Sequence, residues 1–224
     1  MRIKLDIKDI EGIRTVGDLI RSGGIIVFPT DTVFGIGGDP FNTATVDRVI
    51  ELKKREAKPL PVLVAGEERA REVVDVGPVG LFLMKKFWPG ALTIVLKEKG
   101  HLPKQLTQGR GTIGVREPNH ALALKIIEAS GGALIGTSAN ISGESAATTL
   151  DSLDPRIERN VDMVIDGYPP PGGVSSTVIE VVGTTRKINE RFEERIRVLR
   201  EGAIRVEAIR KKISESDLKG ISFE

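Results

Sequence analysis

Short apolar runs alternate with amphipathic segments along most of this chain, and glycine or proline separates them. This alternation is the feature that most limits the fold, because strands repeat every two residues and helices every 3.6. The apolar runs predict strands at Ile25–Phe28, Val62–Ala65, Leu92–Leu96, Thr112–Val115, Leu134–Gly136, Val161–Ile165 and Thr177–Val182. The amphipathic segments predict helices at Thr15–Arg21, Thr43–Arg55, Glu67–Val74, Leu81–Phe87 and Ala121–Ala129.

Strands that alternate with helices indicate an α/β protein. Several connections are too short to hold a helix, which argues against a purely parallel sheet. We therefore expect a mixed, twisted sheet of parallel and antiparallel strands with helices packed on it. The opening segment MRIKLDIKDIEG predicts one more strand, and Asn42 or Thr43 is expected to cap the second helix.

Composition excludes several classes of protein. The 224 residues suffice for one large domain or two small ones, and no linker or repeat divides them. The absence of cysteine excludes disulfides, thiolate metal sites and a cysteine nucleophile. The two histidines, His101 and His120, lie outside any HxH or HExxH pattern, which gives a histidine metal site or a Ser-His-Asp triad little support. No run approaches the length of a membrane span, and we expect a cytoplasmic protein.

Charge is nearly balanced, with 33 basic and 31 acidic residues and a net charge of +2. One stretch departs from this balance, since Thr184–Lys212 holds ten basic and five acidic residues. A solvated helical face is the simpler explanation, and a weak contact with a polyanion such as RNA remains open.

The stretch FPTDTVFGIGG, Phe28–Gly38, begins where a buried run stops at Pro29. Thr30, Asp31 and Thr32 supply short polar side chains, and the glycines after them allow close backbone approach. A buried strand that ends in hydroxyls and glycines is a common place for a small polar ligand. A strand, a tight turn and a second strand is the simpler interpretation.

Four cations gather in LKKREAKP, at the end of the second predicted helix: Lys53, Lys54, Arg55 and Lys58. Interaction with the helix C-terminus and solvent explains them most simply. The functional alternative is a clamp for a polyphosphate, because arginine offers a bidentate fork and lysine a point charge.

Three further stretches place polar groups beside predicted strands. Arg116 ends the strand in GTIGVREP, where a cation suits a carboxylate if a pocket lies beside it. The stretch GTSANISG offers hydrogen-bond donors and acceptors from Thr137, Ser138, Asn140 and Ser142, and a helix cap is the alternative explanation. GGVSST, residues 172–177, leads into the last strand. Each signal is weak alone, but five such loops on one α/β scaffold suggest a single convergent pocket.

Taken in order, the motifs PTDTVFGIG, KxR with KPL, WPG, VREP, TSANISG, GGVSST and LREG resemble those of the YrdC-like family. The resemblance covers Val16–Ile204, and the joint order of the motifs is what makes it specific. Characterised members are threonylcarbamoyl-AMP synthases. The resemblance implies a mixed α/β fold around a concave, positively charged cavity. It also implies the short form, with a catalytic domain over residues 1–206 and a tail over 207–224 that is a short helix or disordered.

The family reaction joins L-threonine, bicarbonate and ATP into threonylcarbamoyl-adenylate and pyrophosphate, and other proteins pass the group to tRNA. The resemblance implies that L-threonine contacts Thr32, Arg116, Ser138 and Ser176. It implies that the nucleotide contacts Arg55, Lys58, Thr112, Asn140, Thr148 and Arg200. Lys53 and Arg55 would act catalytically at the phosphates. Magnesium would arrive on the nucleotide, and the protein itself would need no metal site.

This chemistry suits those residue types, because the carbamate and the triphosphate are both anionic and repel unless cations lie between them. Positioning and charge neutralisation would supply the rate, without a covalent nucleophile. On this interpretation Phe28–Gly38 is a wall of the amino-acid pocket and not a phosphate loop.

The chain departs from the family pattern in three places. Glu56 stands where proline is common and the spacing is shorter, which leaves open which of the nearby lysines contacts the phosphates. Leu63 lies near the position of a histidine in long-form relatives. The segment TTRKINERFEERIRV, residues 184–198, is longer than usual and is predicted to add a surface helix that could move Arg200.

Two other functions remain open from the sequence. An RNA-binding module would need aromatic stacking or many basic contacts, and the chain has one tyrosine and one tryptophan. A paralogue that uses another acyl adenylate or nucleotide would explain the altered KxR spacing, although the intact TSAN and VREP stretches argue against it.

Overall fold

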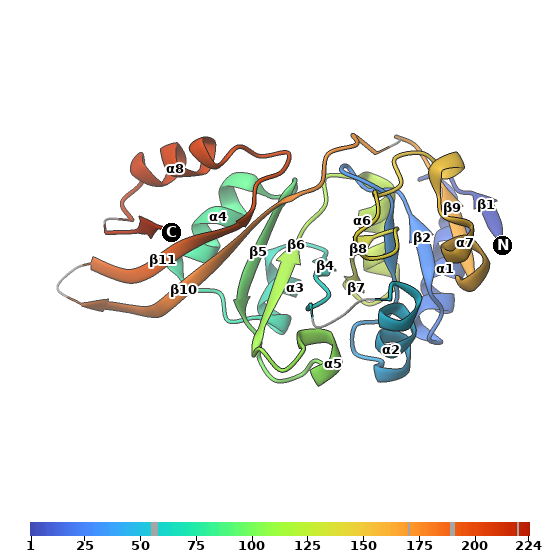
Figure 1. Ribbon diagram of the computed structural model, residues 1–224, viewed down its shortest axis with the longest axis horizontal. Helices are drawn as coiled ribbons and strands as arrows, with labels where there is room; N and C mark the ends of the chain where they lie inside the picture. Colours follow the sequence, from blue (N-terminus) through green and yellow to red (C-terminus); the bar gives the residue numbers. More distant parts are fainter. Residues whose placement is uncertain (55–57, 170, 189–190, 219) are drawn as a thin grey trace.

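The computed structural model describes residues 1–54, 58–169, 171–188, 191–218 and 220–224. Its strands form two mixed sheets (Figure 1). The first has the order β1 (Arg2–Lys4), β9 (Met163–Asp166), β2 (Ile26–Phe28), β3 (Gly35–Gly37), β8 (Thr137–Ser138). The second has the order β12 (Ser222–Phe223), β11 (Arg191–Arg200), β10 (Thr177–Ile188), β5 (Leu92–Lys97), β6 (Thr112–Arg116), β4 (Val62–Val64), β7 (Ala133–Ile135).

The predicted class is confirmed, since both sheets mix parallel with antiparallel pairs and helices flank them. The strands are divided between two sheets, which the local patterns do not specify. Each strand has a local pattern, but its partner is chosen by contacts far away in the chain, as in the parallel pairing of β1 with β9. The turn between β2 and β3 follows the simpler interpretation of FPTDTVFGIGG, because the two strands pair antiparallel with Phe28 opposite Gly35.

The helices are α1 (Ile10–Arg21), α2 (Thr43–Leu52), α3 (Glu67–Val73), α4 (Pro78–Phe87), α5 (Lys104–Thr107), α6 (Ala121–Ala129), α7 (Pro155–Asn160) and α8 (Val206–Ser214). α1 and α6 bury Val16 and Ile126 against the face of β2 that carries Ile26 and Phe28. Gly17 permits this approach, since a Cβ there would lie 2.6 Å from Ala129 O. In the described part of the chain, no helix is long and apolar enough to cross a membrane.

Two helix starts show how polar side chains set the boundaries. Asn42 accepts a hydrogen bond from the Thr45 N–H at the start of α2, which confirms the predicted cap. α1 begins at Ile10, earlier than predicted, because Asp9 caps it by accepting from the Gly12 N–H. The opening strand is correspondingly shorter than predicted and ends at Lys4.

The second sheet has two chemically different faces, because side chains alternate along each strand. Ile94 and Ile113 lie on the apolar face and are fully buried. The opposite face carries Thr93, Val95, Thr112, Gly114, Arg116, Val178 and Glu180. Strand register arranges these residues in rows, with Val95 opposite Gly114 on one side and Glu180 on the other.

The two sheets meet at Gly136, where the chain leaves β7 in one sheet and enters β8 in the other. A Cβ at Gly136 would lie 2.1 Å from Leu63 Cγ, and one at Gly37 would lie 2.3 Å from Ile135 O. Glycine is therefore required at both positions for the sheets to approach. The stretch TSANISG begins at this junction.

The prediction of a surface helix over residues 184–198 is wrong. β10 and β11 form a long antiparallel hairpin, in which Glu180 lies opposite Arg197. The charged segment has no strong local strand pattern, and its pairing with β10 overrides local propensity. The tail forms α8 and then β12. Ile209 and Ile213 of α8 are 0% and 5% exposed, and the Arg210 guanidinium lies 4.3 Å from the Phe223 ring centroid.

Candidate active site

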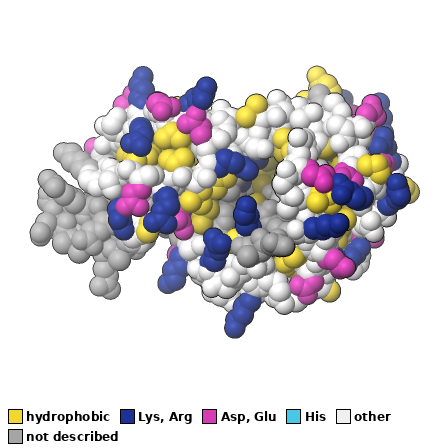
Figure 2. Space-filling model, viewed as in Figure 1, with side chains coloured by type: hydrophobic (Ala, Val, Ile, Leu, Met, Phe, Trp, Pro, Cys, Tyr) yellow, Lys and Arg dark blue, Asp and Glu magenta, His cyan; other side chains and the backbone are white. Residues whose placement is uncertain are grey.

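A cavity of about 630 Å³ lies between the two sheets, a size typical of small-molecule sites. The first sheet contributes β3, β8 and the loop before β3, and the second contributes the polar face of β4, β5, β6, β10 and β11. Figure 2 shows a hollow near the centre of the molecule, bordered by Lys and Arg side chains. The charged residues in the cavity lining are Lys58, Arg110, Arg116, Glu180, Arg197 and Arg200.

Arg116 ends β6 and is 5% exposed. Its Nε donates to Gly90 O at 2.8 Å, Nη1 donates to Thr32 Oγ1 at 2.9 Å and Nη2 donates to Asp31 Oδ1. Burial lowers the pKa of the Arg116 guanidinium, while the Asp31 carboxylate raises it and Arg200 lowers it further. A guanidinium has five N–H groups, so these bonds leave two for a ligand carboxylate.

The hydrogen bonds around Thr32 determine whether its hydroxyl donates or accepts. Thr30 Oγ1 donates to Val33 O at 2.7 Å, which uses its proton. The 3.0 Å contact between the two hydroxyls is therefore donated by Thr32. Because Thr32 Oγ1 also accepts from Arg116, the lone pair that it keeps makes it an acceptor for a ligand N–H or O–H.

Ser176 and Arg200 meet at the other side of the same end of the cavity. Arg200 Nη2 donates to Ser176 O at 2.8 Å and to Ser176 Oγ at 3.3 Å. Ser176 Oγ also lies 2.9 Å from Thr93 Oγ1. The glycines before Ser176 pack on the loop before β3, where the Gly173 N–H donates to Thr32 O at 2.6 Å. Two of the five predicted loops are thus bonded directly to each other.

The TSANISG stretch presents Ser138 to the cavity and keeps Asn140 behind it. Ser138 Oγ donates to Asn140 Oδ1, and Asn140 Nδ2 donates to Ile141 O at 2.9 Å and to Glu144 O at 2.7 Å. Lys53, at 1% exposure, donates from Nζ into this loop. Neither Asn140 nor Lys53 is among the described residues that line the cavity.

Lys58, Arg110 and Thr112 border the far end of the cavity. Thr112 and Arg116 begin and end the same strand, which places them roughly 13 Å apart at about 3.3 Å per residue. That span exceeds a single amino acid. Arg197 and Glu180 lie between the ends and form a cross-strand ion pair with Nη1 3.1 Å from Oε2. Leu63, at the position predicted to lack a histidine, adds an apolar wall.

The structure brings most of the predicted site residues to one cavity: Thr32, Lys58, Thr112, Arg116, Ser138, Ser176 and Arg200. It leaves Lys53, Asn140 and Thr148 out of the cavity lining, and a Cβ at Gly173 would lie 3.8 Å from the methyl carbon of Thr148. The predicted catalytic and nucleotide-binding residue Arg55 lies outside the described residues.

The lining also holds polar residues to which the sequence assigned no ligand: Thr30, Thr93, Arg110, Thr137, Ser175, Glu180 and Arg197. Arg110 stands between two glycines ahead of a predicted strand, a signal comparable to the one that identified Arg116. Thr93 lies two residues before Val95, and the period of two would have placed both on the face that carries the cavity. Arg197 lay in the segment predicted as a helix, so the sequence had no signal for it.

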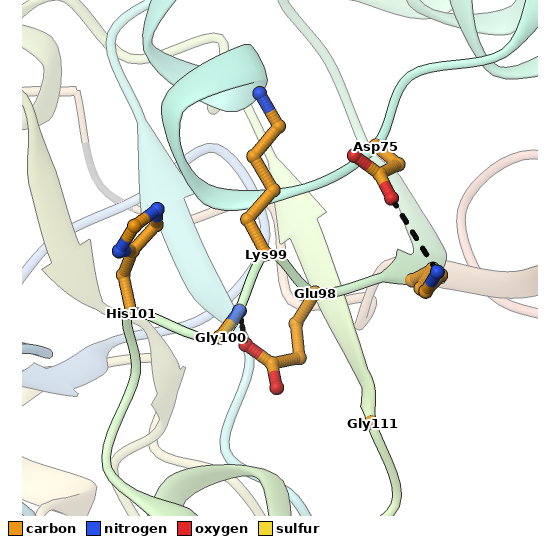
Figure 3. A pocket seen from close by; sticks show the side chains of 7 residues that line it. Asp75, Glu98, Lys99, Gly100, His101 and Gly111 are labelled. Carbon is orange, nitrogen blue, oxygen red and sulfur yellow. Dashed lines mark hydrogen bonds and ion pairs between the residues drawn. The ribbon is translucent and has the colours of Figure 1, made fainter.

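A second, open pocket lies on the surface near the end of β5 (Figure 3). Its polar groups mostly bond to one another: Lys97 Nζ lies 3.9 Å from Asp75 Oδ2, and the Gly100 N–H donates to Glu98 at 2.5 Å. The side chains of Glu98 and Lys99 extend in opposite directions and form no common binding point. Within the described residues, no three His, Cys, Asp or Glu side chains form a group that could hold a metal ion.

Comparison with known proteins identifies the family. A family model named Sua5/YciO/YrdC, with the description "Telomere recombination", matches residues 18–202. A protein of Pyrococcus abyssi named threonylcarbamoyl-AMP synthase is 35% identical over 208 residues, 91% of this chain and 57% of its own length. One of the same name from Thiobacillus denitrificans is 39% identical over 72% of this chain and 87% of its own length. A third, from Bacillus subtilis, is matched over 47% of its length.

Solved structures agree with the sequence comparisons. The structure of Pyrococcus abyssi Sua5 complexed with L-threonine superimposes with a TM-score of 0.85 and 31% identity, covering 100% of this chain and 62% of that one. Escherichia coli YciO superimposes with a TM-score of 0.79 and 26% identity, covering 92% and 96%. The chain spans about half the length of the first two curated relatives. This chain belongs to the Sua5/YciO/YrdC family.

Proposed function

We propose that this protein is an L-threonylcarbamoyladenylate synthase. The observation that carries the proposal is a cavity with a buried guanidinium, Arg116, at one end and the cations Lys58 and Arg110 at the other. A two-ended cavity suits a reaction that joins a small amino acid to a nucleotide. The names of the relatives and the L-threonine complex of Pyrococcus abyssi Sua5 support the same reaction and amino acid.

At the Arg116 end, L-threonine binds by its carboxylate to the two remaining N–H groups of the guanidinium. Thr32 Oγ1 accepts a hydrogen bond from the substrate, since its own proton is already donated to Thr30. Ser138 and Ser176 contact its remaining polar groups. The neutral amine attacks the carbon of bicarbonate, a C–N bond forms, and water leaves as the carbamate is produced.

At the other end, Lys58, Arg110 and Thr112 hold the triphosphate. Arg200, which lies beside Ser176 at the Arg116 end, contacts the nucleotide from that side. A carbamate oxygen attacks the α-phosphorus while the bond to the β-phosphate oxygen breaks, which releases pyrophosphate. The cations offset the repulsion between carbamate and triphosphate. Magnesium would be carried by the triphosphate. Transfer to tRNA then belongs to separate proteins.

The test is pyrophosphate release from ATP and bicarbonate, measured with and without L-threonine. We expect release that depends on threonine and on bicarbonate, and a product with the mass of threonylcarbamoyl-adenylate. Serine and valine are the matched controls, because they keep the carboxylate and amine but change the side chain. Release that is indifferent to threonine would refute the proposal, and salt-sensitive RNA binding without turnover would favour the RNA-binding alternative.

A further inference from the structure

Lys53 caps the C-terminus of α2 and is a buried cation directly behind the Ser138 wall of the cavity. Deepening the proposed function, on which the inference rests, we propose that Lys53 is a positioning residue for the threonine end of the site. It acts through the loop of residues 138–142, which it holds in place, and it does not bind the triphosphate. The first cation of the KxR motif, Lys53, would therefore support binding of the amino acid and not of the nucleotide.

The ammonium of Lys53 is directed into the loop. Its Nζ donates to Ser138 O, to Asn140 O at 2.8 Å and to Asn140 Oδ1 at 3.5 Å. A lysine has three N–H donors, and three acceptors of this loop lie within reach of them. The backbone adds a fourth link, because the Ser142 N–H donates to Lys53 O at 2.9 Å. The end of α2 and the loop are thereby fixed to each other.

Asn140 carries the effect from Lys53 to the cavity. Its Oδ1 accepts from Ser138 Oγ, and its Nδ2 donates to Ile141 O and Glu144 O. The Ser138 hydroxyl proton is committed to Asn140, so Ser138 Oγ faces the cavity as an acceptor. Without Lys53, the two carbonyls and the amide oxygen lose their common donor, and the Ser138 hydroxyl is free to turn.

The position of the charge supports the same role. Lys53 is 1% exposed and does not line the cavity as described, whereas Lys58 lines it and is exposed. An ion held by carbonyl oxygens behind Ser138 adds a fixed positive field to the Ser138 wall of the cavity. A triphosphate needs cations that reach into the cavity, which Lys58 and Arg110 provide.

The experiment compares Lys53→Met with Lys58→Met, and uses Lys85→Met on the exposed surface of α4 as the control. Calorimetry measures L-threonine and ATP binding separately, and pyrophosphate release gives KM for each. We expect Lys53→Met to weaken threonine about tenfold or more and to leave ATP within about twofold. Lys58→Met should show the reverse, and Lys85→Met should change neither. Lys53→Arg should recover part of the threonine affinity, since it restores the charge and donors.

Loss of ATP affinity in Lys53→Met as large as in Lys58→Met would overturn the proposal. If Lys53→Met does not fold, as thermal unfolding would reveal, Asn140→Ala breaks the same chain of bonds and should weaken threonine while sparing ATP. In the double variant, the two losses should not add, because both residues act on Ser138. Failure of the wild-type protein to release pyrophosphate would refute the proposed synthase. The threonine and ATP affinities of the variants would still decide whether Lys53 positions the threonine end of the site.

Discussion

Thr32 Oγ1 accepts a hydrogen bond from Arg116 Nη1 at 2.9 Å, which joins the loop between β2 and β3 to the end of β6, 84 residues away in the sequence. The bond fixes the guanidinium plane and the threonine hydroxyl at once. Together with the Asp31 contact, it leaves one edge of Arg116 for a ligand. The sheets therefore hold the proposed amino-acid subsite in place before any substrate arrives.

Replacing Arg116 by lysine tests this subsite. Lysine keeps the charge but lacks the planar fork, so it cannot satisfy Gly90 O, Thr32, Asp31 and a carboxylate together. We expect KM for L-threonine to rise by about 10- to 100-fold and KM for ATP to stay within about threefold. Steady-state kinetics with each substrate varied in turn gives both values. Equal losses would move Arg116 to the phosphates.

Arg116→Ala should also affect folding. The variant leaves the mostly buried Asp31 carboxylate without its cation, and breaking a buried pair costs roughly 3–5 kcal/mol. Chemical denaturation of Arg116→Ala and of the double variant Arg116→Ala/Asp31→Asn separates this cost from binding. We expect the second change to restore part of the unfolding free energy. If the double variant has no higher unfolding free energy than Arg116→Ala, the unpaired Asp31 carboxylate does not destabilise the protein.

Arg110→Met tests a cavity residue that the sequence motifs did not identify. The exposed guanidinium lies at the Lys58 and Thr112 end, so its removal should weaken ATP severalfold and leave L-threonine unchanged. The salt dependence of ATP binding should also become shallower, because one cation fewer faces the phosphates. Isothermal titration at two ionic strengths measures both effects. Arg71→Met on the surface of α3 is the control, and weakened threonine binding would contradict the assignment.

Glu194→Gln should stabilise the protein at neutral pH. Glu194 is 3% exposed, and its Oε2 has no hydrogen-bond partner among the described residues. Burial raises the pKa of this carboxyl, and a bond from the Val79 N–H lowers it by less. The protonated form is thus favoured in the folded state. The protonated Glu194 carboxyl contributes to the free energy of unfolding. This contribution is fully present below the unfolded pKa of about 4.3 and is lost as the pH rises through the raised folded pKa.

Below about pH 4, the wild-type protein and Glu194→Gln should therefore have the same free energy of unfolding. As the pH rises, that of the wild-type protein should become the lower of the two. At pH 7 the difference should be on the order of 1–3 kcal/mol, the cost of a buried unpaired polar group. Urea denaturation across this range measures it. Glu72→Gln on the surface is the control, and a difference that is constant with pH would contradict the explanation.

Ile209→Ala tests whether the tail belongs to the folded core. Ile209 is fully buried in α8, so truncation should lower the unfolding free energy by about 2–5 kcal/mol. Lys211→Ala on the same helix is the exposed control. Threonine and ATP affinities should not change, since α8 contributes no residue to the cavity. A destabilisation below about 1 kcal/mol would mean that α8 is held only loosely.

Local patterns located Thr32, Arg116 and Ser138, because each follows a short apolar run that stops at a polar stretch. The structure brings all three to one cavity. The same patterns could not place Lys53, since its acceptors are 85 and 87 residues away and depend on packing of the two sheets. They also could not find Arg197. Its strand exists only through pairing with β10.

The basic segment Thr184–Lys212 illustrates the same limit. Its excess of positive charge is visible in the sequence, but the partners are not. Arg195 pairs with Glu224 at 2.6 Å, Arg197 with Glu180 at 3.1 Å and Arg205 with Glu201 at 2.7 Å. Several arginines of this segment therefore form ion pairs within the protein. A contact with RNA remains a prediction, which the salt dependence of binding would test.

The alternating faces of the second sheet separate two kinds of evolutionary change. Along β6, Ile113 and Val115 are fully buried in the core, while Thr112, Gly114 and Arg116 face the cavity. Substitutions at Thr112 alter the cavity wall without removing a core side chain, and those at the odd-numbered positions do the opposite. Arg116 is the exception, because its buried ion pair with Asp31 ties ligand binding to stability at that position. Proteins of this fold can therefore acquire new substrates while the fold itself stays the same.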